Sequence, residues 1–139
     1  MEAQKKAFDL SHDADRHRIA MVIVDTSIWI THLRHGSRRL EELLLDAQVM
    51  CHPFVIGELA CGTMRNRDEI LSLLQTLPAA PTVSLTEALH FIESNSLMGA
   101  GIGFVDVHLL ASAQLASFPL WTSDKRLKEA SHRLGLSYK

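Results

Sequence analysis

Four acidic residues of this 139-residue chain lie in apolar surroundings. Asp25 ends the apolar run MVIV, and Asp124 follows the mostly apolar run PLWTS, so each is expected at the end of a strand. Glu58 in PFVIGELACG and Asp106 in GFVDVHLLASA have largely apolar neighbours on their expected helix faces. A single buried carboxylate takes up a proton to avoid burying its charge, whereas four carboxylates close together require a cation.

A divalent metal ion would supply that positive charge. Carboxylate and water oxygens suit Mg²⁺ or Mn²⁺, while zinc prefers His and Cys ligands, which are absent from these spacings. A cation held in this way activates water and neutralises a phosphoryl oxygen of the substrate. The set of four acids therefore predicts the hydrolysis of phosphodiester bonds.

Each of these acids also has a purely structural interpretation. Asp25 and Asp124 could be helix N-caps, because Asp is favoured where a strand turns into a helix. Glu58 and Asp106 could point into solvent if the boundaries of their helices are misjudged by a few residues. The hypothesis of a metal site therefore depends on the four residues together.

The elements that must position these acids alternate along the chain. Helices are expected over residues 26–33, 53–64, 67–77, 104–116 and 124–135, with two more beginning after Ser37 and Thr86. Short apolar runs predict strands at 21–24, 49–52 and 119–123, with weaker candidates at 82–85 and 136–138. Because strands linked by helices pair in parallel, the expected fold class is α/β, a three-layer α/β/α sandwich with a central parallel sheet. Functional sites in such folds lie at the carboxyl ends of the strands.

Composition indicates one soluble domain. The chain is 47% apolar and 22% charged with a net charge of −2, which is typical of globular proteins. Residues 1–20 are polar and are expected to form a tag or a flexible arm, with the domain spanning 21–139. Cys51 and Cys61 lack metal or redox spacing, so buried free thiols are expected. No apolar run approaches the ~18 residues of a membrane span, and no signal peptide precedes the domain, so we expect a cytoplasmic protein.

The segments that carry the acids resemble a known family. VIVDTSIWI, HPFVIGELACG, GIGFVDVHLLASAQL and LWTSDKRL, in this order and at these separations, are similar to the motifs of the PIN domain. The resemblance is strongest to the VapC-type toxins of bacterial toxin–antitoxin pairs, and it covers about residues 21–136. Two features depart from the family pattern: residues 1–20 have no counterpart, and Leu127 replaces an aromatic residue that is common after the last acid.

This resemblance implies an endoribonuclease that depends on Mg²⁺ or Mn²⁺ and is held inactive by a cognate VapB-type antitoxin. It also implies a homodimer. The resemblance gives the roles of seven residues: a catalytic set of Asp25, Glu58, Asp106 and Asp124, of which Asp25, Asp106 and Asp124 bind metal, and supporting hydroxyls on Thr26, Ser27 and Thr122.

An acidic protein that binds RNA needs local positive charge. Lys125 and Arg126 directly follow Asp124 and are expected to contact phosphates of the RNA, although a solvated helix start would explain them equally well. Arg34 and Arg65 belong to two further basic clusters.

Three other functions remain to be compared with the nuclease. A catalytically inert PIN-like module that docks a protein or RNA partner would have the same fold. A phosphotransferase of the haloacid dehalogenase type needs a second Asp two positions after the first, where this chain has Ser27. A receiver domain needs additional acids before its phosphorylated Asp, where this chain has the apolar MVIV.

Overall fold

The centre of the molecule is a parallel sheet of three short strands. The computed structural model describes residues 20–139. The strands pair in the order β2-β1-β3, and both neighbours run parallel to β1. Their bounds are β1 Val22–Val24, β2 Val49–Met50 and β3 Leu120–Trp121. Apart from Ala20, the predicted N-terminal extension lies outside the described residues, so it stays a prediction.

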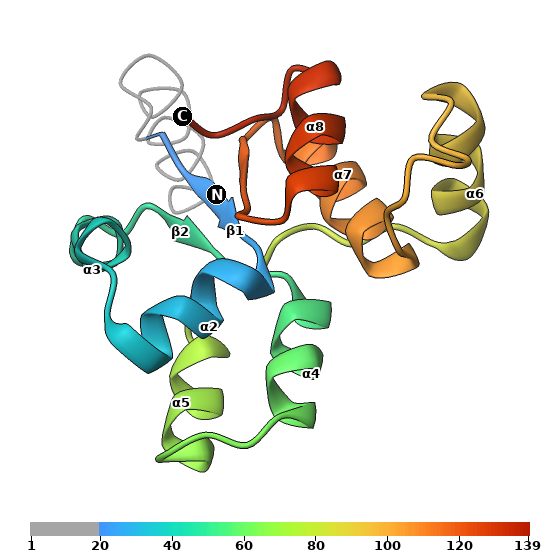
Figure 1. The fold of residues 1–139 in the computed structure, drawn as a ribbon. Coiled ribbons are helices and arrows are strands. Elements are labelled where there is room, and N and C mark those ends of the chain that lie inside the picture. The colour runs from blue at the N-terminus through green and yellow to red at the C-terminus, as the bar shows by residue number, and fades with distance from the viewer. Residues whose placement is uncertain (1–19) are drawn as a thin grey trace, which may run out of the picture.

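Helices flank the sheet on both sides. They are α2 Thr26–His35, α3 Arg38–Leu45, α4 Pro53–Cys61, α5 Arg67–Leu74, α6 Leu85–Ser94, α7 Phe104–Ala116 and α8 Lys125–Arg133. Figure 1 shows α3 to the left of the sheet, α2, α4 and α5 below it, and α6 to α8 on its right. The predicted α/β sandwich with a central parallel sheet is therefore confirmed. Across residues 20–139, no helix combines the length and the apolar character that crossing a bilayer requires.

Strand β1 is the central strand and is covered on both faces. Each of its residues, Val22–Val24, is at most 1% exposed, as expected for an apolar run without alternation. Val24 pairs with Trp121 of β3, so the two residues that follow, Asp25 and Thr122, emerge side by side at the carboxyl end of the sheet. The register of β1 and β3 therefore determines where the first acid lies.

One edge of the sheet differs from the prediction. The strand expected at residues 82–85 is absent, and Ala79 instead forms a parallel bridge with Cys51 beyond β2. The N–H of Cys51 donates to the carbonyl of Pro78 at 2.9 Å. The Ala80 N–H donates in turn to the Cys51 carbonyl at 2.9 Å, and the next residue, Pro81, has no N–H with which to continue the pairing.

Two further boundaries differ from the sequence-based expectation. Helix α6 is capped by Ser84, two residues before Thr86, because Ser84 and Glu87 exchange hydrogen bonds in a capping box. The last predicted strand is reduced to one parallel bridge between Leu120 and Ser137.

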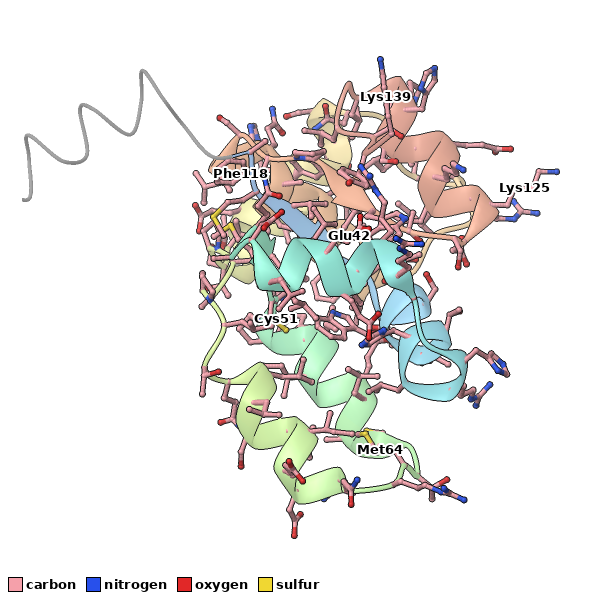
Figure 2. The ribbon with its side chains drawn as sticks, turned by 90° about the vertical axis from the view of Figure 1, so that its left-hand side faces the viewer. Glu42, Cys51, Met64, Phe118, Lys125 and Lys139 are labelled. Atoms are coloured by element: carbon pink, nitrogen blue, oxygen red, sulfur yellow. The ribbon has the colours of Figure 1, made fainter. Side chains whose placement is uncertain are left out.

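The two cysteines lie in different environments. Cys51 is buried among the core residues beneath the helices, as Figure 2 shows, and burial raises the pKa of its thiol to about 12. Cys61, at the end of α4, is exposed, so the prediction of two buried thiols is wrong for this residue. Helix α4 faces the core through Val55 and Leu59, which places Cys61 on another side of the helix.

Helix α7 offers a direct test of the core. Leu109 is fully buried and Leu115, on the same helix, is 60% exposed. Leu109→Ala should lower the free energy of unfolding by about 2–5 kcal/mol, because it removes buried apolar contacts and leaves a cavity. Leu115→Ala should change it by less than about 0.5 kcal/mol. Urea denaturation measures both variants, and equal losses would contradict the assigned packing of α7.

Candidate active site

Asp25 lies at the junction of β1 and α2 and is buried. Its N–H donates to the Trp121 carbonyl at 2.9 Å, which continues the pairing of β1 with β3. Its Oδ2 accepts hydrogen bonds from Thr122 Oγ1 at 2.6 Å and from Ser27 Oγ at 2.8 Å. The side chain makes no capping bond to α2, although Asp25 occupies the N-cap position. The capping interpretation is therefore excluded for its carboxylate.

The two hydroxyls that hold Asp25 also bind the turn between β3 and α8. Ser27 Oγ accepts the N–H of Ser123 at 3.1 Å, and Thr122 Oγ1 accepts the N–H of Asp124 at 3.0 Å. The start of α2 and the start of α8 are thus joined through one small network. In this network Ser27 and Thr122 orient the Asp25 carboxylate and connect it with Asp124.

Asp124 has a capping role, as one interpretation of the sequence suggested. Its Oδ1 accepts the N–H of Leu127 at 3.0 Å and so caps α8. Its Oδ2 accepts no hydrogen bond from the described residues, which leaves an oxygen available for another ligand. Leu127, where the family often has an aromatic, is fully buried and therefore contributes to packing.

Glu58 reaches the same region from α4. Its Oε1 accepts a hydrogen bond from Thr26 Oγ1 at 2.7 Å, which joins α4 to the first residue of α2. The residue is exposed, so the expectation that its helix face is directed toward the core is wrong. The buried face of α4 is made by Val55 and Leu59.

Asp106 lies half-buried in the first turn of α7, where its Oδ2 accepts the N–H of Gly103 at 3.2 Å. Burial raises the pKa of Asp106, and the Gly103 hydrogen bond opposes that rise. The negative charges of Asp25, Asp124 and Glu58 raise the pKa of Asp106 further. All four predicted acids are therefore close enough to interact electrostatically.

Positive side chains do not neutralise these acids. Within residues 20–139, no Lys, Arg or His forms an ion pair with any of the four. Carboxylate oxygens without a partner are hard donors of the kind that Mg²⁺ and Mn²⁺ prefer.

The spacing of the acids restricts the kind of metal site that they can form. In the part of the chain described, no three His, Cys, Asp or Glu side chains come together closely enough to hold an ion as placed. This arrangement does not match a closed zinc site with four protein ligands. It fits Mg²⁺, which uses one or two protein carboxylates and completes its shell with water and substrate phosphates.

The two basic residues after Asp124 lie in different environments. Lys125 projects outward from the start of α8 in Figure 2 and forms no hydrogen bond or ion pair with the described residues. Arg126 lies against Gly101, where a Cβ atom would stand 2.4 Å from the Arg126 guanidinium. Gly101 has a φ of +77°, which favours glycine at this position, whereas the flexible Arg126 side chain can move.

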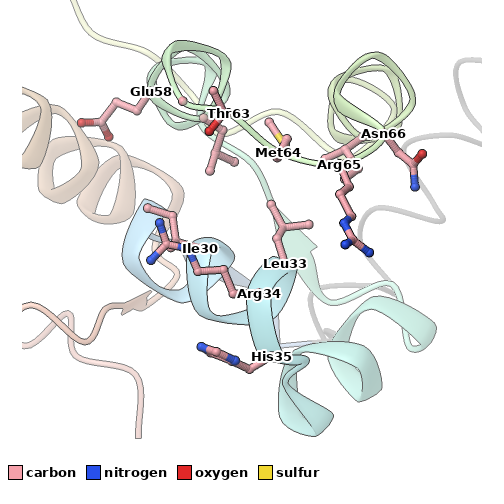
Figure 3. Close-up of a pocket in the computed structure, with 12 residues that line it drawn as sticks. Ile30, Leu33, Arg34, His35, Glu58, Thr63, Met64, Arg65 and Asn66 are labelled. Atoms are coloured by element: carbon pink, nitrogen blue, oxygen red, sulfur yellow. The ribbon is translucent and has the colours of Figure 1, made fainter.

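A cleft of about 1010 Å³ lies between α2, α4 and the loop that leads to α5, with Glu58 among its lining residues. Figure 3 shows the Glu58 carboxylate pointing away from Met64 and Arg65. Arg34 and Arg65, from two separate basic clusters of the sequence, both line the cleft. The fold thus brings two arginines into the cleft that Glu58 also lines.

Sequence reasoning missed a cluster of aromatic rings beside the acids. His52 caps α4 by accepting the N–H of Phe54 on Nδ1 at 2.9 Å, and its ring lies 6.4 Å from that of buried His108. Burial, followed by the charge of His108, lowers the pKa of His52 to about 4, and burial also lowers the pKa of His108. Both are therefore neutral at pH 7. The His-Pro pair before α4 is a signal that could have identified the cap.

Comparison with known proteins identifies the class to which this fold and site belong. The family model for the PIN domain matches residues 22–133. The chain therefore belongs to the PIN domain family, as the four motifs suggested.

Its relatives show the likeness in more detail. The chain is 47% identical over 118 residues to Ribonuclease VapC32 of Mycobacterium tuberculosis, in both strain CDC 1551 / Oshkosh and strain ATCC 25618 / H37Rv. The alignment covers 84% of this chain and 95% of each relative. This likeness confirms the resemblance to VapC-type toxins.

A solved structure supports the fold. The crystal structure of PAE2754 from Pyrobaculum aerophilum superposes with a TM-score of 0.59 at 15% identity, covering 80% of this chain and 84% of that one.

The raised pKa of Asp106 predicts an effect on stability. A carboxyl whose pKa is higher in the folded than in the unfolded state stabilises the protein at low pH, and that contribution is lost as pH rises through the folded-state pKa. At pH 7 the charged Asp106 side chain therefore lowers the free energy of unfolding. Asp106→Asn keeps an oxygen for the Gly103 N–H, so with chelator at pH 7 it should unfold at higher urea concentration than the parent.

This advantage should shrink as the pH is lowered toward 4, because the parent side chain then becomes neutral as well. Glu129→Gln, an exposed position on α8, makes the same change of charge outside the acid cluster and should give no gain. A less stable Asp106→Asn variant at pH 7 would show that repulsion among the acids is not significant.

Proposed function

We propose that this protein is an endoribonuclease that uses a divalent metal ion and acts as the toxin of a toxin–antitoxin pair. One observation carries the proposal: four carboxylates from separate segments lie near one another at the carboxyl end of the sheet, with no cationic partner among the described residues. The likeness to Ribonuclease VapC32 supports RNA as the substrate.

The metal ion, Mg²⁺ or Mn²⁺, would be held by Asp25, Asp106 and Asp124, one or two of them directly and the rest through coordinated water. When bound, such an ion polarises a phosphoryl oxygen and lowers the pKa of a coordinated water. Each of the three carboxylates has one oxygen that accepts no hydrogen bond from the described residues, which supports this assignment.

The protein's own residues orient the reacting groups. Thr122 and Ser27 fix the Asp25 carboxylate through its Oδ2, which leaves Oδ1 for the ion. Glu58 is held through Oε1 by Thr26, so its Oε2 can accept a proton from the attacking water. The water oxygen would then form a bond to phosphorus as the bond to the leaving oxygen breaks, and the leaving oxygen would take up a proton from bulk water.

Positive residues around the acids would bind the RNA backbone. Lys125 projects from the start of α8, and Arg126 adjoins it, so both can contact phosphates on one side of the acids. Arg34 and Arg65 supply charge along the cleft next to Glu58. Such contacts position a nucleic acid without reading its sequence.

Family likeness also supports two protein partners: a VapB-type antitoxin that holds the enzyme inactive, and a second copy of the chain in a homodimer. The name of the VapC relatives is the basis for the antitoxin. We retain the inert binding module as the alternative function, since it would have the same fold and could keep the same acids.

Cleavage of RNA separates these two functions. Purified protein should cut total RNA at discrete positions with Mg²⁺ or Mn²⁺ and not with chelator. Replacing the hydrogen-bond partner of a metal ligand typically costs about 10- to 100-fold in activity, so Asp25→Asn, which alters a ligand itself, should lower the rate at least about 100-fold. Gel electrophoresis of the RNA over time shows both the dependence of cleavage on metal and the rate of cleavage by each variant.

Asp46→Asn, at an exposed position after α3, is the matched control and should cut as the parent does. Circular dichroism should show that both variants are folded. Full activity of Asp25→Asn, or equal activity in chelator, would contradict the proposed chemistry.

A further inference from the structure

Two phenylalanine rings remain partly exposed beside the acids. Phe54 is 40% exposed in the first turn of α4, and Phe104 is 47% exposed as the first residue of α7. Both rings contact the His108 ring in T-shaped arrangements, with distances between ring centroids of 4.7 Å for Phe54 and 4.6 Å for Phe104. Two segments far apart in the sequence thus share one central ring.

Phe54, Phe104, His52 and His108 form one aromatic cluster, and its two histidines are held in the protein interior. His108 is 4% exposed and His52 is fully buried, and the His52 ring lies 5.0 Å from that of Phe54. The hydrogen bond from the Phe54 N–H to His52 also holds the backbone that carries the ring. Rings held in place before a ligand arrives lose little conformational freedom when it binds.

The cluster is continuous with the acids of the active site. Phe54 lies one helical turn before Glu58 on α4, and residues four positions apart share a face of a helix. Phe104 precedes Asp106 by two residues on α7 and follows Gly103, whose N–H binds the Asp106 carboxylate. Each ring therefore lies within one helical turn of a predicted site acid on its own helix.

We propose that Phe54 and Phe104 form a stacking platform for an unpaired base of the RNA substrate, next to the phosphodiester that is cut. The inference rests on the proposed function and specifies which part of the RNA the enzyme holds. Every base has a π face that stacks on aromatic rings, and proteins that recognise single-stranded RNA use such rings.

The chemistry of the surface favours a base over an apolar protein segment. The other strongly exposed apolar side chains of the described residues have no aromatic ring, and most lie on several helices, among them Leu73, Leu85, Leu89 and Leu115. The two exposed aromatic rings instead lie together beside carboxylates, which suits a substrate that brings a metal-bound phosphate and a flat base at once.

The test measures binding of a short, fluorescently labelled, single-stranded RNA of mixed sequence. Asp25→Asn serves as the background, in Mg²⁺, so that the probe is not cut. Adding Phe104→Leu or Phe54→Leu should weaken binding on the order of tenfold, the effect expected for losing one stacked base. Phe104→Tyr, which keeps a ring, should bind as the background protein does.

Two controls separate stacking from other effects. Leu115→Ala, at the other end of α7, should leave binding unchanged, because this side chain is exposed but distant in the helix from the acids. Since the phenylalanines carry no charge, the dependence of binding on salt should have the same slope in the Leu variants as in the background protein.

The results distinguish this proposal from the broader function. Unchanged affinity in both Leu variants, while the parent still cleaves RNA, would overturn the stacking platform and leave the nuclease intact. Loss of binding accompanied by dissociation of a dimer in light scattering would also overturn it, because the rings would then form an interface between copies. A parent that neither binds nor cuts RNA would overturn both proposals.

Discussion

Repulsion among four carboxylates is the constraint on which the active site depends. Burial raises the pKa of Asp106, and the charges of Asp25, Asp124 and Glu58 raise it further. No described cation forms an ion pair with any of the four acids. Like charges at such a distance persist only where the surrounding structure holds them in place. The hydroxyls of Thr26, Ser27 and Thr122 perform this role by donating to Asp25 and Glu58. A bound divalent ion would convert the repulsion into attraction.

The fold reduces this repulsion through helix starts. Asp25 and Asp124 occupy the N-cap positions of α2 and α8, and Asp106 lies in the first turn of α7. The positive end of a helix dipole favours negative charge at these positions. Parallel strands direct the following helices to one edge of the sheet, so several such ends converge there. The same topology places the Phe54 and Phe104 rings, which also lie in first turns, beside the acids.

Much of this arrangement could be predicted from the sequence, because the signals for it are local. The apolar run before Asp25 indicated a buried central strand, and the alternation of strands with helices indicated a parallel sheet. Other features depend on tertiary packing. The packing of helices against the sheet determines the exposure of Glu58 and the contact of two distant phenylalanines with His108. Pairing at the edge of the sheet determines that Ala79 forms a bridge in place of residues 82–85. No short sequence window contains that information.

The most direct test is a calorimetric titration of the protein with Mn²⁺. If Asp25, Asp106 and Asp124 form the metal site, the parent protein should bind Mn²⁺, and Asp25→Asn should bind it at least about tenfold more weakly. Mn²⁺ should also raise the melting temperature of the parent more than that of the variant, because a ligand stabilises the state that binds it. Equal affinity in the two proteins, or no binding by the parent, would contradict the assignment of these acids to a metal centre.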